Sequence, residues 1–384
     1  MLSAALAAGL AAEGASVFDL GVLPTPGVAW HSAEEDLPAA VVSASHNPYR
    51  DNGVKFFAAG GRKLTDAQEA QFEAQLEAWA EAGAAGPAVG WVARRDGSRP
   101  YEASLVESVG GRRLDGMRVV LDCANGAASA VAPAVFGALG AEVTVIHAEP
   151  DGRNINEGCG STYPARLQAE VVDHLADAGL AFDGDADRVL AVDGAGALVD
   201  GDQLISLLAV DRGLDAVVVT VMANLGFRQA MARHGIEVVE TPVGDRYVLE
   251  ALEKGRWTLG GEQSGHIIFR DLATTGDGIL TGVQVLDVMA RTGRTLADLA
   301  SVMTRLPQVL RNVRVPTAGL AGAGELWAEV RAVEAELGGD GRVLVRPSGT
   351  EPLVRVMVEA TTAEAAEAAT DRLCAAAVRA LGPA

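Results

Sequence analysis

A run of alternating acidic residues is the first segment of this sequence whose spacing suggests chemistry. Asp183, Asp185 and Asp187 follow the apolar residues 180–182, and three carboxylates this close would repel one another unless a cation lay between them. Their oxygens suit a hard ion, and because no Cys or suitably spaced His joins them, Mg²⁺ is favoured over Zn²⁺. An EF-hand loop is excluded, since its sixth position needs Gly where this chain has Arg188. A solvated acidic turn is the plainer alternative.

A serine-rich loop, SASHNP at residues 43–48, is the second such segment. It follows the apolar run 39–42, so a strand delivers the hydroxyl of Ser45 and the ring of His46 to one end of a sheet, where open α/β sheets bind ligands. Ser, Asn and Pro are also ordinary turn residues, which is the alternative for this loop. Lys55 lies nearby in an otherwise apolar stretch, and it either reaches solvent or supplies a positive charge to the serine loop.

A third segment, GGEQSGH at residues 260–266, follows the strand-like residues 257–259. Two glycines allow the backbone to approach a ligand closely, while Glu262, Ser264 and His266 offer acceptors and donors suited to sugar hydroxyls. An imidazole with an ordinary pKa of about 6.5 could exchange a proton with such a hydroxyl. A hydrogen-bonded histidine at a strand edge is the alternative for His266.

A fourth segment near the C-terminus, RPSGTEP, has the composition of a phosphate site. Guanidinium groups, hydroxyls and a glycine backbone amide all donate to phosphate oxygens. A charged hairpin turn could contain the same residues, but it would not explain why two hydroxyls fall between two arginines. We therefore expect this acidic chain to hold a phosphate here, through Arg346, Ser348, Gly349, Thr350 and Arg355.

The elements that must position these loops follow a repeated order of strand, Asn/Gly turn, helix, glycine and strand. This order occupies residues 117–146 and recurs in residues 216–239, and residues 4–19 match its second half. It is the βαβ rhythm of a parallel sheet. The chain ends differently, with strands expected at 342–346 and 353–359 before an Ala-rich helix. The sequence thus predicts an α/β protein with three related mixed or parallel α/β domains and a C-terminal α+β domain.

Four domains are expected, one for each of the four segments. Glycine and charged residues separate the repeated units and mark the joints between them. In chain order, the domains carry the serine loop, the acidic loop, the sugar-hydroxyl loop and the phosphate loop. Their expected bounds are residues 1–109, 110–213, 214–306 and 307–384.

Composition limits the partners of the chain. Its 384 residues include 51 Asp and Glu against 31 Lys and Arg, a formal net charge of −20. Such a charge repels nucleic acid and anionic membrane surfaces, and no apolar run approaches the roughly 18 residues of a membrane span. Cys123, Cys159 and Cys374 are far apart and form no CxxC pair. We therefore expect no disulfide framework, no thiolate zinc site and a reducing cytoplasm.

Taken together, the four segments resemble the α-D-phosphohexomutase superfamily. SASHNP is similar to its phosphoserine loop, DGDADR to its metal loop, GGEQSGH to its sugar loop and RPSGTEP to its phosphate loop, in the same order along the chain. Three further stretches resemble the branch that acts on glucosamine phosphates. They are LDCANGA at 121–127, NINEGCGST at 154–162 and VGDRYV at 243–248.

The resemblance implies roles for the serine and acidic loops. Ser45 would be phosphorylated in the resting enzyme. One Mg²⁺ per chain would be bound by Asp183, Asp185, Asp187 and a phosphoryl oxygen on Ser45. Arg188 would lie near that phosphoryl group.

The resemblance also implies the residues that meet the substrate. Lys55 and His266 are implied as general acid and base, with the order of the two left open. Glu262 and Ser264 would contact sugar hydroxyls, and the phosphate segment would hold the phosphate that is not reacting. The implied substrate-binding residues are His46, Glu262, Ser264, His266, Arg346, Ser348, Gly349, Thr350 and Arg355.

The implied reaction is that of an isomerase that transfers phosphate intramolecularly. Phosphoserine would donate its phosphoryl group to glucosamine 6-phosphate, giving a 1,6-bisphosphate that returns the other phosphate to Ser45 and leaves glucosamine 1-phosphate. The expected partners are a hexosamine phosphate and its bisphosphate, with neither nucleic acid nor membrane; the oligomeric state stays open.

Three alternatives remain at this point. The sugar could be mannose or glucose, since phosphomannomutase and phosphoglucomutase belong to the same superfamily. A strand that ends in DxD also opens aspartyl-phosphate chemistry, which would place the phosphoryl group on Asp183. Finally, superfamily members begin with a strand and a Gly-Thr-Asp-Gly-x-Arg-Gly stretch, whereas this sequence begins in an expected helix. It is therefore expected to be truncated, and it could bind sugar phosphates without turning them over.

Overall fold

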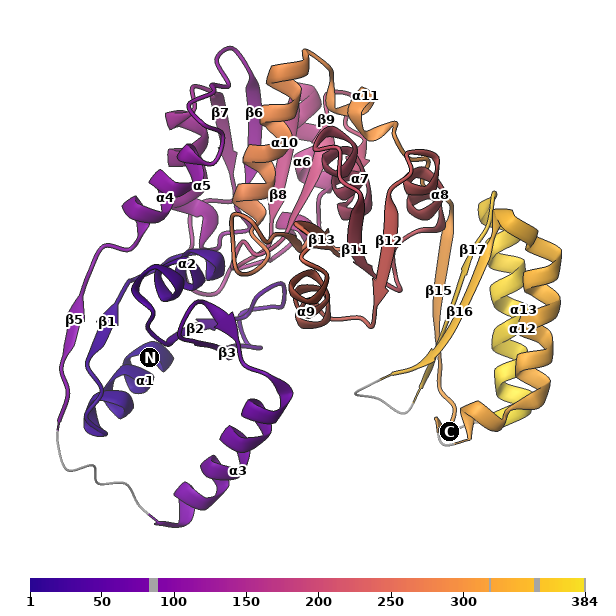
Figure 1. The fold of residues 1–384 in the computed structure, drawn as a ribbon, viewed down its shortest axis with the longest axis horizontal. Coiled ribbons are helices and arrows are strands. Elements are labelled where there is room, and N and C mark those ends of the chain that lie inside the picture. Colours follow the sequence, from indigo (N-terminus) through magenta and orange to yellow (C-terminus); the bar gives the residue numbers. More distant parts are fainter. Residues whose placement is uncertain (83–88, 318, 349–352, 383–384) are drawn as a thin grey trace. The chain divides into compact units, whose positions relative to one another are not determined.

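The computed structural model describes residues 1–82, 89–317, 319–348 and 353–382, and Figure 1 shows its elements. The chain groups into two compact units. The larger unit consists of residues 1–222 and 236–302, and the smaller of residues 223–235 and 303–384. The three predicted α/β regions lie in the chain segments of the larger unit, except for residues 223–235 and 303–306, which group with the smaller unit. The four domain boundaries expected from the sequence stay a prediction.

The N-terminal region contains two small sheets. β1 pairs in parallel with β5, while β2, β3 and β4 form an antiparallel sheet. Gly14, which follows the first helix, has φ +90°, so the predicted helix stop is confirmed. The elements are α1 (Leu2–Ala12), β1 (Val17–Asp19), α2 (Thr25–Glu35), β2 (Ala39–Ser43), β3 (Gly53–Ala58), β4 (Arg62–Lys63), α3 (Asp66–Ala82) and β5 (Val92–Arg94).

The next two sheets repeat one topology, as the sequence predicted. Their strand orders are β10-β9-β8-β6-β7 and β14-β13-β11-β12, each with parallel inner strands and an antiparallel neighbour on one side. The strands are β6 (Arg118–Asp122), β7 (Glu142–Ile146), β8 (Ala178–Phe182), β9 (Val189–Asp193), β10 (Leu198–Val199), β11 (Ala216–Thr220), β12 (Glu237–Thr241), β13 (Leu259–Gly261) and β14 (Ile267–Phe269).

Helices connect these strands along the chain. α10 packs against β8 and β9, and the side chain of Asp277 caps its first turn by accepting the backbone N–H of Leu280. The helices are α4 (Ser98–Glu107), α5 (Ala128–Ala138), α6 (Ala165–Asp173), α7 (Gly201–Asp211), α8 (Leu225–Arg233), α9 (Asp245–Gly255), α10 (Gly278–Thr292) and α11 (Leu296–Ala300).

Three of the four chemically distinctive segments are hairpin loops. The serine loop joins β2 to β3, the acidic loop joins β8 to β9, and the sugar-hydroxyl loop joins β13 to β14. Each therefore turns back into an antiparallel neighbour instead of leading into a crossover helix. β8 is buried along its whole length, which explains its uninterrupted apolar sequence.

One expectation about glycine is wrong. Gly260 and Gly261 belong to β13 and do not form a ligand-facing loop. A Cβ at Gly260 would lie 2.6 Å from the carbonyl oxygen of Val218, and one at Gly261 would lie 2.4 Å from that of His266. Close approach by neighbouring backbone thus accounts for both glycines.

The strands and helices of the smaller unit form an α+β fold, as predicted. β15 (Gln308–Val313), β17 (Val354–Glu359) and β16 (Arg342–Pro347) form an antiparallel sheet. α12 (Gly324–Leu337) and α13 (Ala363–Leu381) lie side by side against it (Figure 1). The sequence reading missed β15 and α12. The half-exposed pattern of β15 explains why its apolar signal is weak.

Among the described residues, no helix has the length and apolar character that crossing a bilayer requires.

Candidate functional site

The acidic loop forms a buried group of carboxylates. Asp183, Asp185 and Asp187 have one oxygen each within 4.8 Å of one another, and all three are at most 3% exposed. Oδ1 of Asp185 and Oδ1 of Asp187 are buried, yet they accept no hydrogen bond from any described residue. Leaving a buried carboxylate oxygen without a partner is costly. The donor set and its unfilled oxygens therefore fit a hard divalent cation.

The electrostatics of this loop agree with that fit. Burial, reinforced by the charges of Asp187 and Asp185, raises the pKa of Asp183 well above its ordinary value. Burial opposes ionisation of Asp187 as well, but the adjacent His266 and Lys55 hold the pKa of Asp187 well below its ordinary value. The three carboxylates thus repel one another more than the neighbouring side chains compensate. A bound cation would reduce this repulsion.

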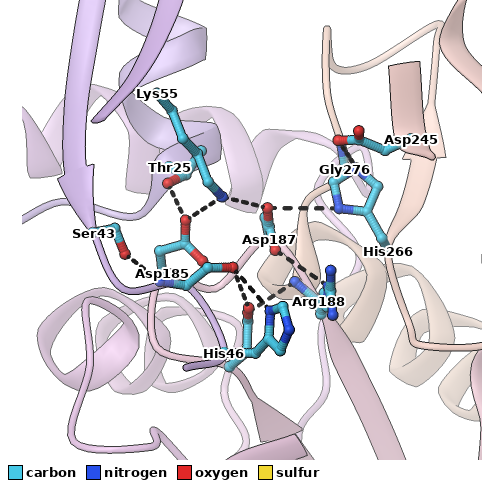
Figure 2. A network of polar contacts seen from close by, with 12 residues as sticks. Thr25, Ser43, His46, Lys55, Asp185, Asp187, Arg188, Asp245, His266 and Gly276 are labelled. Carbon is cyan, nitrogen blue, oxygen red and sulfur yellow. Dashed lines mark hydrogen bonds and ion pairs between the residues drawn. The ribbon is translucent and has the colours of Figure 1, made fainter. Parts of the chain in front are cut away.

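The second oxygens of two of these aspartates are held by side chains from the N-terminal region. Lys55 Nζ donates to Oδ2 of Asp185 at 2.6 Å and to Oδ2 of Asp187 at 3.0 Å. Thr25 Oγ1 donates to the same Asp185 oxygen at 2.5 Å (Figure 2). Burial lowers the pKa of Lys55, but the two carboxylates outweigh it and raise that pKa above its ordinary value. Lys55 therefore supplies positive charge and does not reach out to solvent.

The serine loop places its hydroxyl beside the acidic loop. Ser45 Oγ lies 3.4 Å from Oδ2 of Asp183 and 3.4 Å from Nδ1 of His46. Ser45 has φ +52°, and Ser43 Oγ accepts its backbone N–H at 2.9 Å. Burial and the charge of Arg188 lower the pKa of His46. The half-buried hydroxyl of Ser45 thus faces the carboxylates of the acidic loop, an arrangement that the family resemblance implied.

Arg188 closes the acidic loop. Its backbone N–H donates to Oδ1 of Asp183 at 3.1 Å. Its buried Nε makes no hydrogen bond within the described part of the chain. Burial lowers the pKa of Arg188, but the charges of Asp187 and Asp183 outweigh burial, so the net pKa is raised. The guanidinium therefore stays charged beside the serine loop.

His266 is enclosed behind the acidic loop. It is 2% exposed, and its Nε2 accepts the backbone N–H of Gly276 at 3.2 Å. Its other ring nitrogen, Nδ1, lies 3.7 Å from Oδ2 of Asp187. Asp245 lies on the other side, with Oδ2 3.3 Å from Nε2 (Figure 2). The ring therefore bridges two aspartates.

The rest of the sugar-hydroxyl loop is more open. Ser264 is exposed and Glu262 is half-buried. Glu262 Oε1 accepts the backbone N–H of Gly244 at 3.2 Å. The loop is fixed to the acidic-loop hairpin, because Val189 donates its backbone N–H to the carbonyl of Gly265 at 3.1 Å. Glu262 and Ser264 thus stand on a rigid support with polar atoms available to a ligand.

Sequence reasoning missed three residues of this network. Thr25 is the buried first residue of α2, and its place between two prolines in LPTP was the available sequence signal. Asp245 and Lys63 form an ion pair beside His266. Burial raises the pKa of Asp245, but His266 and Lys63 overcome it and lower that pKa to about 2. Asp245 lies in the VGDRYV stretch, which the sequence reading used only as a branch marker.

The phosphate segment brings two cations together in the smaller unit. Arg346 and Arg355 are cross-strand partners in β16 and β17. Burial and the nearby charge of Arg355 lower the pKa of Arg346. Among the described residues, neither Nε atom nor the buried Ser348 Oγ has a hydrogen-bond partner. The pair suits an anion. Gly349 and Thr350 lie outside the described residues.

Comparison with known families covers nearly the whole chain. Four successive models of the phosphoglucomutase/phosphomannomutase family match it: the alpha/beta/alpha domains I, II and III and the C-terminal domain. The matched residues are 1–83, 100–196, 200–306 and 310–376.

Curated relatives and solved structures agree with this match. A phosphoglucosamine mutase of Thermobifida fusca is 55% identical over 381 residues, covering 97% of this chain and 84% of the relative. One of Frankia alni is 54% identical over 391 residues, covering 100% and 86%. A phosphoglucomutase/phosphomannomutase family protein of Burkholderia thailandensis has a similar structure, with TM-score 0.80, 26% identity and coverage of 99% and 86%. An Aspergillus fumigatus N-acetylphosphoglucosamine mutase, solved with GlcNAc-6P and magnesium, shares the fold at TM-score 0.70, 20% identity and 99% coverage of both chains. The chain thus belongs to the phosphoglucomutase/phosphomannomutase family, together with the relatives that are named phosphoglucosamine mutase.

Proposed function

We propose that this chain interconverts glucosamine 6-phosphate and glucosamine 1-phosphate, with Ser45 as the phosphoryl carrier and a 1,6-bisphosphate as intermediate. The observation that carries the proposal is the Ser45 hydroxyl, 3.4 Å from Asp183 in a loop whose other aspartates keep two buried oxygens unfilled. The names of relatives more than half identical to the chain support glucosamine phosphate as the sugar. Mannose and glucose phosphates are the competing substrates.

We assign the metal site to Asp183, Asp185 and Asp187, with Mg²⁺ as the ion. When bound, Mg²⁺ would neutralise charge on the transferred phosphoryl group. Magnesium is also present in the Aspergillus fumigatus structure. The family relationship and the carboxylate donors support this assignment.

We assign the transfer itself to residues around Ser45. The sugar hydroxyl forms a bond to phosphorus while the bond from phosphorus to Ser45 Oγ breaks. Arg188 would offset the negative charge of the phosphoryl group. Lys55 would exchange a proton with the two reacting oxygens: the sugar hydroxyl loses one proton as its bond to phosphorus forms, and the serine oxygen takes one up as it leaves. His266, enclosed between Asp187 and Asp245, would take part in proton exchange through Asp187.

We assign substrate contacts to two groups of residues. His46, Glu262 and Ser264 would meet the sugar and its reacting phosphate. The phosphate that is not being transferred would be held by the phosphate segment, because two adjacent guanidinium groups favour an anion. Those residues are Arg346, Ser348, Gly349, Thr350 and Arg355. We also place the protein in a reducing cytoplasm, in line with its three free cysteines.

Peptide mapping by mass spectrometry tests the proposal. We expect phosphate on Ser45 of active protein and its exchange with glucosamine 6-phosphate. Ser45→Ala should lose the phosphate and at least about 10³-fold in turnover while keeping its melting temperature. Ser301→Ala, at the exposed end of α11, is the matched control.

Four outcomes would redirect the proposal. Retained activity in Ser45→Ala would reject the phosphoserine carrier. Acid-labile phosphate on Asp183 would point to aspartyl-phosphate chemistry. Faster turnover of mannose or glucose phosphates than of glucosamine phosphates would change the substrate, and ligand binding without any turnover would leave a binding protein.

A further inference from the structure

One side chain from the loop after β7 reaches the serine loop. Asn156 Nδ2 donates to the carbonyl oxygen of Ser45 at 2.7 Å and to that of Asn47 at 2.8 Å. Asn156 is 6% exposed and has φ +58°, a conformation that Asn tolerates better than most residues. Both hydrogens of one buried amide are thus committed to the backbone that carries the hydroxyl.

We propose that Asn156 is a positioning residue for phosphoryl transfer at Ser45, an inference that rests on the proposed function. Ser45 itself has φ +52°, which costs a residue with a side chain about 1 kcal/mol and persists only where neighbours enforce it. The amide of Asn156 enforces it by binding the Ser45 carbonyl. The backbone from which Oγ projects is thereby restrained.

The acidic loop limits the same carbonyl from a second side. A Cβ at Gly184 would lie 2.5 Å from the Ser45 carbonyl oxygen, so only a glycine fits between Asp183 and Asp185. The Ser45 peptide is therefore confined between the Asn156 amide and the backbone of the acidic loop. Movement of the serine relative to the carboxylates would require breaking the Asn156 bonds.

Asn156 is in turn held by the turn that follows β6. Its backbone N–H donates to the carbonyl of Ala124 at 2.9 Å. Ala127 in the same turn donates its backbone N–H to the carbonyl of Gly184 at 2.8 Å. One turn therefore fixes both Asn156 and the acidic loop. This gives the LDCANGA and NINEGCGST stretches a physical role, which is to set the distance between the serine and the aspartates.

The expected effect is on the rate of transfer and not on substrate binding. Misplacement of a reacting group by about 1 Å can cost about 10²-fold. Asn156→Asp keeps the shape but turns both donors into acceptors that face two carbonyls. We expect kcat to fall about 10²-fold while KM for glucosamine 6-phosphate stays within about threefold, because other residues contact the sugar.

The experiment compares three variants with the wild type by steady-state kinetics and by single-turnover transfer from phosphorylated Ser45 to glucosamine 6-phosphate. Asn156→Gly removes the side chain and suits φ +58°, so it guards against a folding defect specific to Asp. Asn154→Asp is the matched control on the same loop, since its amide donates to the carbonyl of Glu149 at 2.9 Å. Melting temperatures check that each variant is folded.

Slow transfer in both Asn156 variants, with wild-type KM and a normal Asn154→Asp control, supports the inference. Wild-type transfer in both Asn156 variants, or a loss that appears only in KM, overturns it. Wild-type protein that never carries phosphate on Ser45 would instead reject the proposed function, before any variant is compared.

Discussion

Two groups of metal-ligand side chains lie at the ends of neighbouring strands in one sheet, and they differ in what their oxygens already bind. The acidic loop follows β8, whereas Asp122, His147 and Cys159 gather after β6 and β7, again with one ligand atom each within 4.8 Å. Oδ1 of Asp122 accepts the backbone N–H of Ala124 at 3.0 Å. Oδ2 accepts that of Gly160 at 3.0 Å and lies 3.1 Å from Nδ1 of His147.

The difference teaches that ligand type alone does not make a metal site. Both oxygens of Asp122 accept backbone N–H groups, while Oδ1 of Asp185 and Oδ1 of Asp187 are buried and accept no hydrogen bond from a described residue. Oδ1 of Asp187 lies 3.8 Å from Nε of Arg188 in an ion pair. Burial and the charge of Asp122 raise the pKa of Cys159 to about 12, so its thiol stays neutral. The oxygens of Asp122 therefore hold the backbone of the protein as a structural clasp, whereas two oxygens of the acidic loop accept no such hydrogen bond.

Of the three predictions from this comparison, the largest effect is a loss of activity expected from a change in the acidic loop. Asp185→Asn removes one carboxylate charge from the metal site but leaves an oxygen to accept from Thr25. We expect activity to fall by about 10²–10³-fold and the Mg²⁺ concentration for half-maximal activity to rise. Activity measured over a Mg²⁺ series provides the check. An unchanged Mg²⁺ response would mean that the acidic loop is not the metal site.

A smaller effect, on stability, is expected in the clasp. Asp122→Asn turns an amide donor toward the backbone N–H of Gly160 or of Ala124, leaving a buried donor unsatisfied. We expect the free energy of unfolding in urea to fall by about 1–3 kcal/mol, with the Mg²⁺ response of the folded fraction unchanged. Metal analysis of the purified protein provides the opposite test. One zinc per chain in the wild type, absent from Cys159→Ser, would show that the clasp is itself a metal site.

The smallest effect concerns another buried carboxylate, that of Asp277, which accepts hydrogen bonds from the protein. Asp277 accepts from Tyr101 Oη at 2.7 Å and from the backbone N–H of Leu280 at 2.9 Å. Burial nevertheless raises its pKa from 3.8 to about 6. Because the folded pKa lies above the unfolded one, the stability linked to the protonated form is present below pH 3.8 and lost as pH rises through about 6.

Asp277→Asn should therefore gain stability relative to wild type as pH rises from about 4 to 7. We expect a gain of about 1–2 kcal/mol at pH 7, since the neutral amide still accepts the helix-cap hydrogen bond. Urea unfolding of both proteins at several pH values gives the difference directly. A difference that stays constant across this range would show that Asp277 does not titrate in the folded protein.

Much of the fold followed from local patterns in the sequence. Met117 to Ile146 was predicted as strand, helix and strand, and β6, α5 and β7 occupy that stretch. Such short-range periodicity depends on neighbouring residues and needs no tertiary knowledge. β15 was missed because its residues alternate weakly and half of them are exposed. The glycines of β13 were misassigned because their reason, a close backbone neighbour, is invisible in one strand.

The sequence by itself determined which loops to propose as the site, because three alternate aspartates, or a lysine in an apolar strand, are unfavourable unless opposite charges offset them. Only the tertiary structure decided how those side chains are paired. Lys55 and Thr25 meet Asp185 across more than 100 residues of chain, and Asn156 meets Ser45 across a similar interval. The physical reason is that strand register and contacts between loops decide whether a given oxygen accepts a hydrogen bond, and no local sequence pattern encodes either of them. Those occupied and unfilled oxygens separate the clasp at Asp122 from the site at Asp185.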